Sequence, residues 1–492
     1  MVFLICSRIG TQMLTSTIKE ELKKIFGEGN VSCSREDLLC YSYDATNSMR
    51  LPEAVVFPSC AEEVSSIMKL ANSEGFSVTP RGAGTGFSGG SVPVEGGVVM
   101  SFERMKRILS IDTDNLTAVV EPGVNTWEFQ QEVESRGLFY PPDPTSLKFS
   151  TIGGNIAECA GGPRAVKYGV TKDYVLGLEV VLPTGEIIKT GAATVKGVVG
   201  YDLTKLIVGS EGTLGIVTKA TLRLLPLPEH TITSLAVFSS LKGAAQSVSD
   251  IIREKVIPST LEFIDSTSLR CVEQYAKIGL PAAGAVLLIE VDGSAQAAQK
   301  EAQKVREVCM SNGAVSVNAA NGKNEVKDLW KARRAISASL YRIRPNKINE
   351  DIVVPRASIP ALIAGIEEIS GSLGILIACF GHAGDGNVHV NVMYDKGDPK
   401  EAATAERAVE EVFKLTLGLG GTISGEHGVG IAKAKYIGME LSPAVIGLMK
   451  EIKKTFDPNG VLNPGKIFPP GETARDAVYP EDAGSGARKM RN

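Results

Sequence analysis

The glycine-rich stretch PRGAGTGFSGGSVP, residues 80–93, decides the fold. Its segment GTGFSG matches the GxGxxG pattern of dinucleotide-binding turns through Gly84, Gly86 and Gly89. A Rossmann turn continues directly into a helix, whereas here Pro93 and Gly96-Gly97 exclude a helix and the strand-like run GGVVMSF follows. The sequence therefore predicts a loop between two strands whose bare backbone N–H groups can hold an anion. The alternative is a flexible surface loop.

A second loop rich in small residues, YPPDPTSLKFSTIGGNIAECAGGPRAVKYG, covers residues 140–169. Its glycines and alanines allow the backbone to approach a large flat ligand closely. One loop would hold phosphates and the other a ring, so the pair of loops suits a long cofactor.

The composition is that of a globular protein of two or three domains, with 492 residues, 43% hydrophobic residues, 22% charged residues and a net charge of −4. This balance argues against general nucleic-acid binding. None of the eight cysteines forms a CxxC pair, which argues against a zinc ribbon and against an iron–sulfur cluster within the chain.

The compartment is predicted from the thiols and from the absence of export signals. Scattered cysteines suit a reducing cytoplasm, and no apolar run reaches transmembrane length. The N-terminal MVFLICSRIGTQ, residues 1–12, has an apolar run broken by Arg8 and no small-residue cleavage site, so we expect no signal peptide. The sequence predicts a cytoplasmic protein. Any association with a membrane surface would be through a partner protein.

Turn and helix signals predict an α+β fold in four parts. Residues 1–225 mix short strands and helices with glycine loops, as two subdomains, until Pro226 and Pro228 mark a boundary. Residues 226–428 alternate strands and helices, as in TITSLAVFSS followed by LKGAAQSVSDIIREK, which predicts a sheet with covering helices. Residues 429–468 are helical again, and the polar tail 469–492 is expected to be disordered.

Three of the four histidines lie in FGHAGDGNVHVN, residues 380–391, and GGTISGEHGVG, residues 420–430. The first motif predicts strand, tight turn, strand, with His389 and Asn391 on one face and His382 able to face His389. Two imidazoles and the Glu426 carboxylate form a three-ligand set with an open position, as in catalytic zinc sites. Packed, hydrogen-bonded histidines explain the residues equally well. We expect Asp385 to serve the turn.

The segment WKARRAISASLYRIRPNKIN, residues 330–349, has six basic residues and no acid. It predicts a local positive field in an acidic protein, although most of these charges are expected on a solvated helix face. Arg333 and Ser337 are four residues apart and therefore share one face of the predicted helix.

Together the motifs resemble those of the vanillyl-alcohol oxidase superfamily. PRGAGTGFSGGSVP, PPDPTSLKFSTIGGNIAECAGG and GSEGTLGIVT are similar to its flavin-binding domain. FGHAGDGNVHVN, ISGEHGVG and VLNPGKIF narrow the resemblance to the group of the glycolate oxidase FAD subunit and the D-lactate and D-2-hydroxyglutarate dehydrogenases. The resemblance covers roughly residues 35–468. It implies a PCMH-type FAD-binding domain and an α+β cap domain for substrate.

The resemblance implies FAD as the cofactor, held by the glycine loops. Residues implied around the pyrophosphate are Arg81, Gly82, Ala83, Gly84, Thr85, Gly86, Gly89, Gly90 and Ser91. Residues implied near the flavin are Pro144, Ser146, Thr151, Gly154, Asn155, Ala160, Gly161, Gly162, Gly215, Ile216, Val217 and Asn463. Thr85 stands where relatives with covalent flavin have histidine, so non-covalent FAD is expected. Cys159 replaces a polar amide residue of many relatives, and serves packing or redox sensitivity.

The resemblance further implies one divalent metal ion on His382, His389 and Glu426. Zinc, iron and manganese all accept such ligands. His427 is implied as the general base that removes the hydroxyl proton. The implied substrate-binding residues are Arg333, Ser337, Lys347, Asn391 and His427, with Arg334 as the alternative to Arg333 for holding the carboxylate.

The predicted reaction is flavin-dependent oxidation of a D-2-hydroxy acid, D-lactate or glycolate, to the 2-oxo acid, with D-2-hydroxyglutarate as the alternative substrate. Electrons would pass to a separate acceptor: an iron–sulfur subunit, an electron-transfer flavoprotein, a quinone or a cytochrome. A homodimer and a hetero-complex both stay open. Rival hypotheses are a flavin-free metallohydrolase, a non-catalytic FAD subunit and a phenol oxidase. The glycine loops argue against the first, and the histidine motifs argue against the other two.

Overall fold

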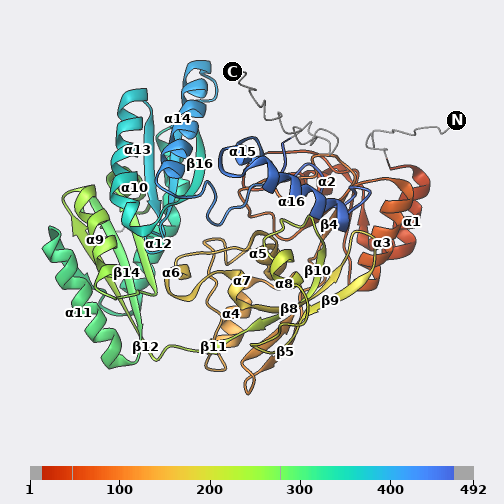
Figure 1. Cartoon of the computed structure of the whole chain (residues 1–492), viewed down its shortest axis with the longest axis horizontal. Coiled ribbons are helices and arrows are strands. Elements are labelled where there is room, and N and C mark those ends of the chain that lie inside the picture. Colours follow the sequence, from red (N-terminus) through yellow and green to blue (C-terminus); the bar gives the residue numbers. More distant parts are fainter. Residues whose placement is uncertain (1–13, 47, 278, 470–492) are drawn as a thin grey trace, which may run out of the picture.

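The computed structural model describes residues 14–46, 48–277 and 279–469 (Figure 1). The expectations for the N-terminus and, Pro469 apart, for the polar tail therefore lie outside the described residues. The chain forms an N-terminal lobe of residues 14–226 and a middle lobe of residues 227–428, and residues 429–469 return to the N-terminal lobe. None of the helices in the described ranges is long and apolar enough to cross a membrane.

The first half of the N-terminal lobe is a small sheet with two helices packed on it. The strands, in the order β1-β2-β4-β3, are β1 (Val31–Ser32), β2 (Ala54–Val56), β4 (Val98–Ser101) and β3 (Val78–Arg81). The helices α1 (Ser16–Phe26) and α3 (Ala61–Glu74) share a buried cluster with this sheet, and α2 (Arg35–Cys40) lies between β1 and β2 along the chain. Residues 82–97 between β3 and β4 contain no helix, which confirms that the glycine loop is no Rossmann turn.

The second half of the N-terminal lobe is an antiparallel sheet. Its strands, in spatial order, are β5 (Ile108–Asp112), β6 (Thr117–Val120), β10 (Ile216–Arg223), β8 (Val175–Val181) and β9 (Ile187–Gly191). Around it lie β7 (Leu138–Phe139), paired with β11 (Leu225–Pro226), and the helices α4 (Thr126–Glu134), α5 (Ile152–Glu158), α6 (Ala165–Tyr168), α7 (Thr171–Tyr174) and α8 (Leu203–Ile207). The β5–β6 and β8–β9 pairs are hairpins of consecutive strands.

The middle lobe is built on one seven-stranded antiparallel sheet. Its strands, in spatial order, are β15 (Ala314–Ala319), β12 (His230–Phe238), β14 (Ala285–Gly293), β13 (Thr260–Asp265), β17 (Leu376–Gly381), β18 (Asn387–Tyr394) and β16 (Asn346–Val353). The helices are α9 (Leu241–Arg253), α10 (Ser266–Ala276), α11 (Ala295–Ser311), α12 (Gly322–Ser339), α13 (Ile359–Leu373) and α14 (Pro399–Gly418). The predicted hairpin around the histidine motif is β17–β18.

The two faces of this sheet differ in what covers them. Helices α9, α11, α13 and α14 bury one face in a large apolar cluster that includes Val388, Val390 and Val392. Helices α10 and α12 cover only part of the other face, beside Ala378, Phe380 and Met393. Because side chains alternate along β18, His389 lies on the second face, as predicted. His389 and Asn391 of β18 therefore lie on the face that the helices leave partly uncovered.

The C-terminal segment packs back onto the N-terminal lobe. Helices α15 (Ile437–Glu440) and α16 (Pro443–Phe456), blue in Figure 1, lie over the N-terminal lobe. Beyond them, Leu462 forms a parallel bridge with Val78, and the Asn463 N–H donates to the Val78 carbonyl at 2.8 Å. The segment therefore adds a short edge to the strand that leads into the first glycine loop.

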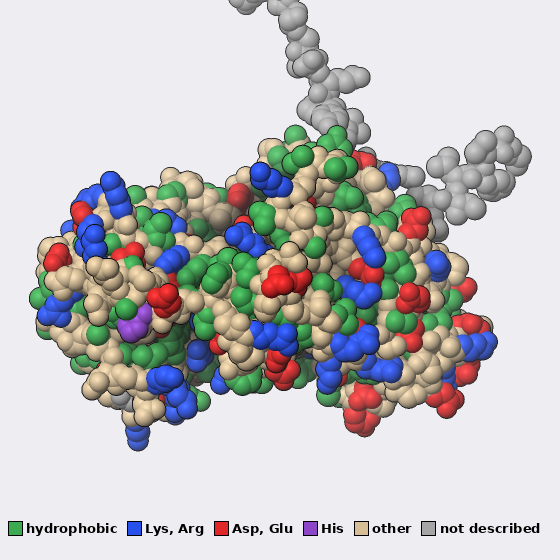
Figure 2. All heavy atoms as spheres, turned by 90° about the horizontal axis from the view of Figure 1, so that it is seen from below, with side chains coloured by type: hydrophobic (Ala, Val, Ile, Leu, Met, Phe, Trp, Pro, Cys, Tyr) green, Lys and Arg blue, Asp and Glu red, His purple; other side chains and the backbone are tan. Residues whose placement is uncertain are grey.

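Figure 2 shows the two lobes side by side with the surface hollowed between them. On the face seen there, acidic and basic side chains alternate without a broad field of one sign. This distribution agrees with the small net charge of −4.

Replacing Leu287 by alanine tests the sheet core. Leu287 lies in β14 and is fully buried, so Leu287→Ala should lower the free energy of unfolding by about 2–5 kcal/mol through lost apolar burial and a residual cavity. Urea denaturation followed by circular dichroism measures this change. The matched control is Leu448→Ala, because Leu448 in α16 is 64% exposed and should change stability by less than about 0.5 kcal/mol. Equal effects would contradict the central position of β14.

Candidate functional site

A cavity of about 620 Å³ lies between the two lobes. Three loops of the N-terminal lobe and one face of the middle sheet form its walls. Of the residues predicted to bind the cofactor, those that line it are Arg81, Gly82, Ala83, Gly84, Thr85, Gly86, Gly90, Ser91, Pro144, Ser146, Thr151, Gly154, Asn155, Ala160, Gly215, Ile216 and Val217. The structure thus brings both predicted loops, and the GSEGTLGIV loop, to one space.

Four of the predicted cofactor residues do not line the cavity: Gly89, Gly161, Gly162 and Asn463. Asn463 Nδ2 donates to the carbonyls of Gly90 at 3.0 Å and Glu211 at 2.9 Å, so it ties the C-terminal segment to two loops. Gly161 lies so close to the middle lobe that a Cβ there would be 2.8 Å from Glu426 Oε2. A larger residue at this position would therefore displace the Glu426 carboxylate, which glycine leaves in place beside the histidines.

Two acids in the cavity wall, Glu158 and Glu211, were not predicted from the sequence. Glu211 accepts the N–H groups of Val429 at 2.8 Å and Gly430 at 2.6 Å, and Glu158 contacts the Ser88 hydroxyl at 3.2 Å. Burial, and then the neighbouring Glu211, raise the pKa of Glu158 well above its ordinary value. The pair therefore holds four loops together while carrying less than its full negative charge. In the sequence, the only indication of their role was that each glutamate stands among small residues, in NIAECAGG and GSEGTLG.

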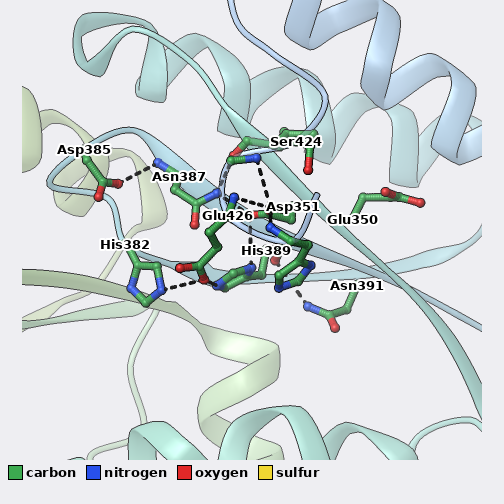
Figure 3. A network of polar contacts seen from close by, with 12 residues as sticks. Glu350, Asp351, His382, Asp385, Asn387, His389, Asn391, Ser424 and Glu426 are labelled. Carbon is green, nitrogen blue, oxygen red and sulfur yellow. Dashed lines mark hydrogen bonds and ion pairs between the residues drawn. The ribbon is translucent and has the colours of Figure 1, made fainter. Parts of the chain in front are cut away.

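The predicted metal ligands converge on one carboxylate oxygen (Figure 3). Glu426 Oε1 lies 3.2 Å from His382 Nε2 and 3.6 Å from His389 Nε2. The two rings stand nearly perpendicular, with centroids 5.1 Å apart. The other ring nitrogen of each histidine faces a buried carboxylate: Glu262 Oε1 at 2.5 Å from His382 Nδ1, and Asp351 Oδ1 at 3.7 Å from His389 Nδ1.

This arrangement fits a divalent cation. Metal-bound histidines usually donate their second ring N–H to a carboxylate, which fixes the tautomer and the ring orientation. His389 Nδ1 is buried without a hydrogen-bond partner, and the two Nε2 atoms meet the carboxylate from different sides. The donor set of two imidazoles and one carboxylate is compatible with zinc, iron or manganese.

Asp351, on β16, holds the loop that carries Glu426 and His427, and the sequence did not predict it. Its Oδ2 accepts three successive backbone N–H groups, from Gly425 at 3.0 Å, Glu426 at 2.8 Å and His427 at 2.8 Å. Burial alone would raise its pKa, but electrostatic attraction to His427, Lys433 and His389, with the hydrogen bond from the Glu426 N–H, holds the pKa well below its usual range.

Asp351 also lies near His389, Glu426 and His427, with potential ligand atoms all within 4.8 Å of one another. Its oxygens are already engaged, because Oδ1 accepts Asn387 Nδ2 at 2.5 Å while Oδ2 accepts the three amides. Asp351 is therefore better suited to support the ligands than to bind a cation itself. The adjacent acids Glu350 and Asp351 in the strand run NKINEDIV were the available signal.

His427, the predicted base, lines the cavity between two aromatic rings. Its ring stacks on His389, with centroids 5.4 Å apart, and on Phe87 of the first glycine loop at 5.1 Å. Burial lowers the pKa of His427. The ring is thus held in position by one residue from each lobe.

The two candidate arginines have different surroundings. Arg333 is 4% exposed, its guanidinium lies 4.9 Å from the Phe380 ring centroid, and its Nε donates to Glu262 Oε2. Its Nη2 is buried without a partner, and the residue lines the cavity. Arg334 also lines the cavity, but its side chain lies against Trp330 and is more exposed than that of Arg333. The unpaired buried donor is on Arg333.

The remaining predicted substrate residues lie partly behind the cavity wall. Ser337 lines the cavity, whereas Lys347 stands behind it, with Nζ 2.5 Å from Ser337 Oγ. Burial lowers the pKa of Lys347 to about 8. Asn391 contacts backbone carbonyls, while Asn349, directly opposite in the β16–β18 register, lines the cavity and was not predicted. Asp385 accepts the Asn387 N–H at 3.2 Å within the turn, as expected.

Comparison with known proteins places the chain in a family. The family described as "FAD linked oxidases, C-terminal domain" matches residues 227–467, and the family described as "FAD binding domain" matches residues 52–191. Over 471 residues the chain is 48% identical to "Glycolate oxidase subunit GlcD" of Bacillus subtilis, covering 95% of this chain and 100% of that one. The chain belongs to the FAD-linked oxidase family. FAD is therefore the cofactor of this FAD-linked oxidase.

Other relatives and the fold agree with this assignment. The FAD-linked oxidase is 34% identical over 465 residues to "D-2-hydroxyglutarate dehydrogenase" of Stutzerimonas stutzeri, covering 93% of this chain and 100% of that one. It is 33% identical over 476 residues to "D-lactate dehydrogenase [cytochrome], mitochondrial" of Arabidopsis thaliana, covering 94% and 83%. Substrate-bound p-cresol methylhydroxylase superposes with a TM-score of 0.76 at 19% identity, covering 91% and 95% of the two chains. This likeness shows the PCMH-type fold that the resemblance implied.

Replacing Asp351 by asparagine tests its hold on the loop of the FAD-linked oxidase. The variant keeps the shape but removes the charge that three amides share. Hydrogen exchange of a peptide spanning residues 423–430, read by mass spectrometry, should quicken at least about tenfold, because a hydrogen bond to a charged group contributes about 1.5–3 kcal/mol. Asp265→Asn is the matched control, since Asp265 accepts the amides of Ser268 and Cys379 elsewhere. Unchanged exchange in D351N would refute this anchoring.

Proposed function

We propose that this FAD-linked oxidase oxidises a D-2-hydroxy acid, D-lactate or glycolate, to the corresponding 2-oxo acid. One observation carries the proposal: a single cavity joins the glycine loops to Arg333, His427, His389 and Glu426. It thus combines a cofactor space, an anion-binding group, a base and a candidate cation site. The names of the relatives, glycolate oxidase and D-lactate dehydrogenase, support the same substrate class.

The cofactor is proposed to lie along the three loops, without a covalent bond. The first loop would meet the pyrophosphate with its backbone N–H groups and Arg81. The small residues of the second loop and Gly215, Ile216 and Val217 of the third would approach the flavin ring. Bound FAD supplies the two-electron acceptor for the hydrogen on the α-carbon.

Arg333 is proposed to bind the carboxylate of the substrate. Glu262 occupies its Nε, so the two terminal nitrogens, of which Nη2 is buried without a partner, are the donors left for an anion. Phe380 lies under the guanidinium plane and restricts its direction. A 2-hydroxy acid held there by its carboxylate would direct its hydroxyl group toward the neighbouring histidine cluster.

His427 is proposed to accept the hydroxyl proton while the α-hydrogen leaves with its electron pair. Stacking between Phe87 and His389 holds the imidazole at the junction of the two lobes. We further propose that His382, His389 and Glu426 hold one divalent cation, zinc, iron or manganese. Such a cation would supply a Lewis acid for the hydroxyl oxygen.

A separate electron acceptor is proposed to reoxidise the enzyme. The sequence has no CxxC pair for an iron–sulfur cluster of its own. One relative is named a subunit and another carries the word cytochrome in its name. An acceptor protein or a quinone fits this pattern, and a cytoplasmic enzyme would meet a membrane through such a partner.

A second substrate, D-2-hydroxyglutarate, is favoured by the polar wall next to the site. Along β16, Lys347, Asn349 and Asp351 alternate onto the face that carries His389. Asn349 lines the cavity, where its amide NH₂ group could donate to a carboxylate, and Lys347 lies beyond it against Ser337. A second carboxylate on the substrate would find polar groups there. Comparing D-2-hydroxyglutarate with D-lactate in the assay below decides between the two.

Replacing His427 by alanine tests the base. His427→Ala should slow flavin reduction by D-lactate about 100-fold or more, because general base catalysis contributes roughly 10²–10⁴ in rate. FAD should stay bound, and stopped-flow absorbance in a single anaerobic turnover gives the rate. His230→Ala is the control, since His230 is exposed at the start of β12. An unchanged reduction rate in H427A would show that the base is another group.

Removing the cation tests the metal proposal. Anaerobic holoenzyme is mixed with D-lactate, L-lactate, glycolate and D-2-hydroxyglutarate before and after chelation, and metal content is checked by mass spectrometry. The flavin absorbance should bleach with a D-acid or glycolate, fail to bleach after the metal is stripped, and bleach again after Zn²⁺ or Mn²⁺ is added. Bleaching by a fully stripped enzyme would disprove the role of the cation and leave the flavin chemistry intact.

A further inference from the structure

Glu262 lies at the centre of β13, fully buried, and contacts both halves of the site. Its Oε1 is 2.5 Å from Nδ1 of His382, which is the proposed cation ligand. Its Oε2 accepts the Nε–H of Arg333, which is the proposed carboxylate-binding residue. One side chain therefore joins two groups that are 49 positions apart in the sequence, at residues 333 and 382.

The charge of Glu262 is balanced by these two partners. Each of its two carboxylate oxygens faces one partner: Oε1 faces the His382 ring and Oε2 faces the Arg333 guanidinium. The neighbouring residues Leu261 and Phe263 belong to the apolar core on the other face of the sheet. A buried carboxylate in such a strand needs both partners to stay ionised.

The two contacts also determine which atoms face the cavity. With Nδ1 engaged, His382 can offer only Nε2 to a cation, and this nitrogen already points at Glu426. With Nε engaged, Arg333 can offer only its two terminal nitrogens to an anion, and of these Nη2 is buried without a partner. The position of one carboxylate thus sets the direction of a metal ligand and of an anion-binding group together.

We propose that Glu262 is a positioning residue that couples cation binding to carboxylate binding in this enzyme. That the anion is the carboxylate of a 2-hydroxy acid rests on the proposed function. That Glu262 links the two binding groups rests on its contacts with His382 and Arg333. Losing Glu262 should weaken two separate interactions, the affinity for the cation and the affinity for the substrate carboxylate.

Glutamine at position 262 is the sharpest test, because two donors face this side chain. A carboxylate has an acceptor oxygen for each donor, whereas a glutamine has one oxygen and one NH₂ group. Glu262→Gln therefore leaves either His382 or Arg333 facing another donor, with almost no change in volume. Glu290→Gln is the matched control, since Glu290 is a buried glutamate of the paired strand β14 that accepts from Thr233 and Trp330 instead.

The first measurement is Zn²⁺ affinity, read by isothermal titration calorimetry on FAD-loaded, chelator-stripped protein without substrate. E262Q should bind Zn²⁺ about 10–100-fold more weakly than the wild type, as expected when the carboxylate partner of a ligating histidine is removed. E290Q should bind Zn²⁺ like the wild type. Bound FAD absorbance and the unfolding temperature confirm that each variant is folded.

The second measurement isolates the anion-binding arm. With Zn²⁺ at saturating concentration, the KM of E262Q for D-lactate should rise about tenfold or more while kcat changes less, because carboxylate binding is shared by ground state and transition state. A purely structural defect would lower the amount of active enzyme and leave KM unchanged. E290Q again serves as the control.

Each result decides a separate point. Wild-type Zn²⁺ affinity in folded E262Q overturns the coupling, as does a wild-type KM at saturating Zn²⁺. A wild-type enzyme whose flavin is bleached by none of the acids would refute the proposed function, while the Zn²⁺ titration would still judge the contact with His382. If E262Q does not retain FAD, the same two measurements are made on Glu262→Asp. Aspartate keeps both carboxylate oxygens, but its side chain is one methylene shorter, so the oxygens lie farther from His382 and Arg333. Wild-type values for E262D in both measurements would overturn the proposal.

Discussion

A carboxylate buried in a β-sheet must be matched by donors, and this constraint shapes the site of the FAD-linked oxidase. Glu262 satisfies it with Arg333 and His382, and Asp351 satisfies it with three amides of the loop that bears Glu426 and His427. Both acids project from the same face of one antiparallel sheet. The groups proposed for catalysis are held in place because they are the hydrogen-bond and charge partners of the two buried acids.

The second constraint is the close approach of backbone from the N-terminal lobe to this sheet. Gly161 touches the space beside Glu426, and Phe87 of the first loop stacks on His427. Asn463 fastens the C-terminal segment to the first and third loops, so the cavity wall is closed by residues from both ends of the chain. A cofactor along the loops and a substrate on the sheet therefore share one space, which a reaction between them requires.

Much of the local structure was predictable because it depends on short patterns. The period of two in NVHVNVMY predicted which residues of β18 face the site, and the glycine-rich turn before it predicted the β17–β18 hairpin. Pro93 and Gly96-Gly97 were enough to exclude a Rossmann helix. The loops and histidine motifs also carried the resemblance to the family, since their residue types are constrained by close backbone approach and by ligand chemistry.

By itself, the sequence determined the strands, the turns and the residue types that can bind a flavin, an anion and a cation, because these follow from neighbours along the chain. Only the tertiary structure decided which groups meet. Glu262 reaches His382 across 120 positions and Asp351 reaches His427 across 76, through strand order β13-β17-β18-β16. Strand order depends on the packing of the whole sheet, so a lone acid in an apolar strand indicates a partner without identifying it. The choice between Arg333 and Arg334 had the same origin, because only packing buries one and exposes the other.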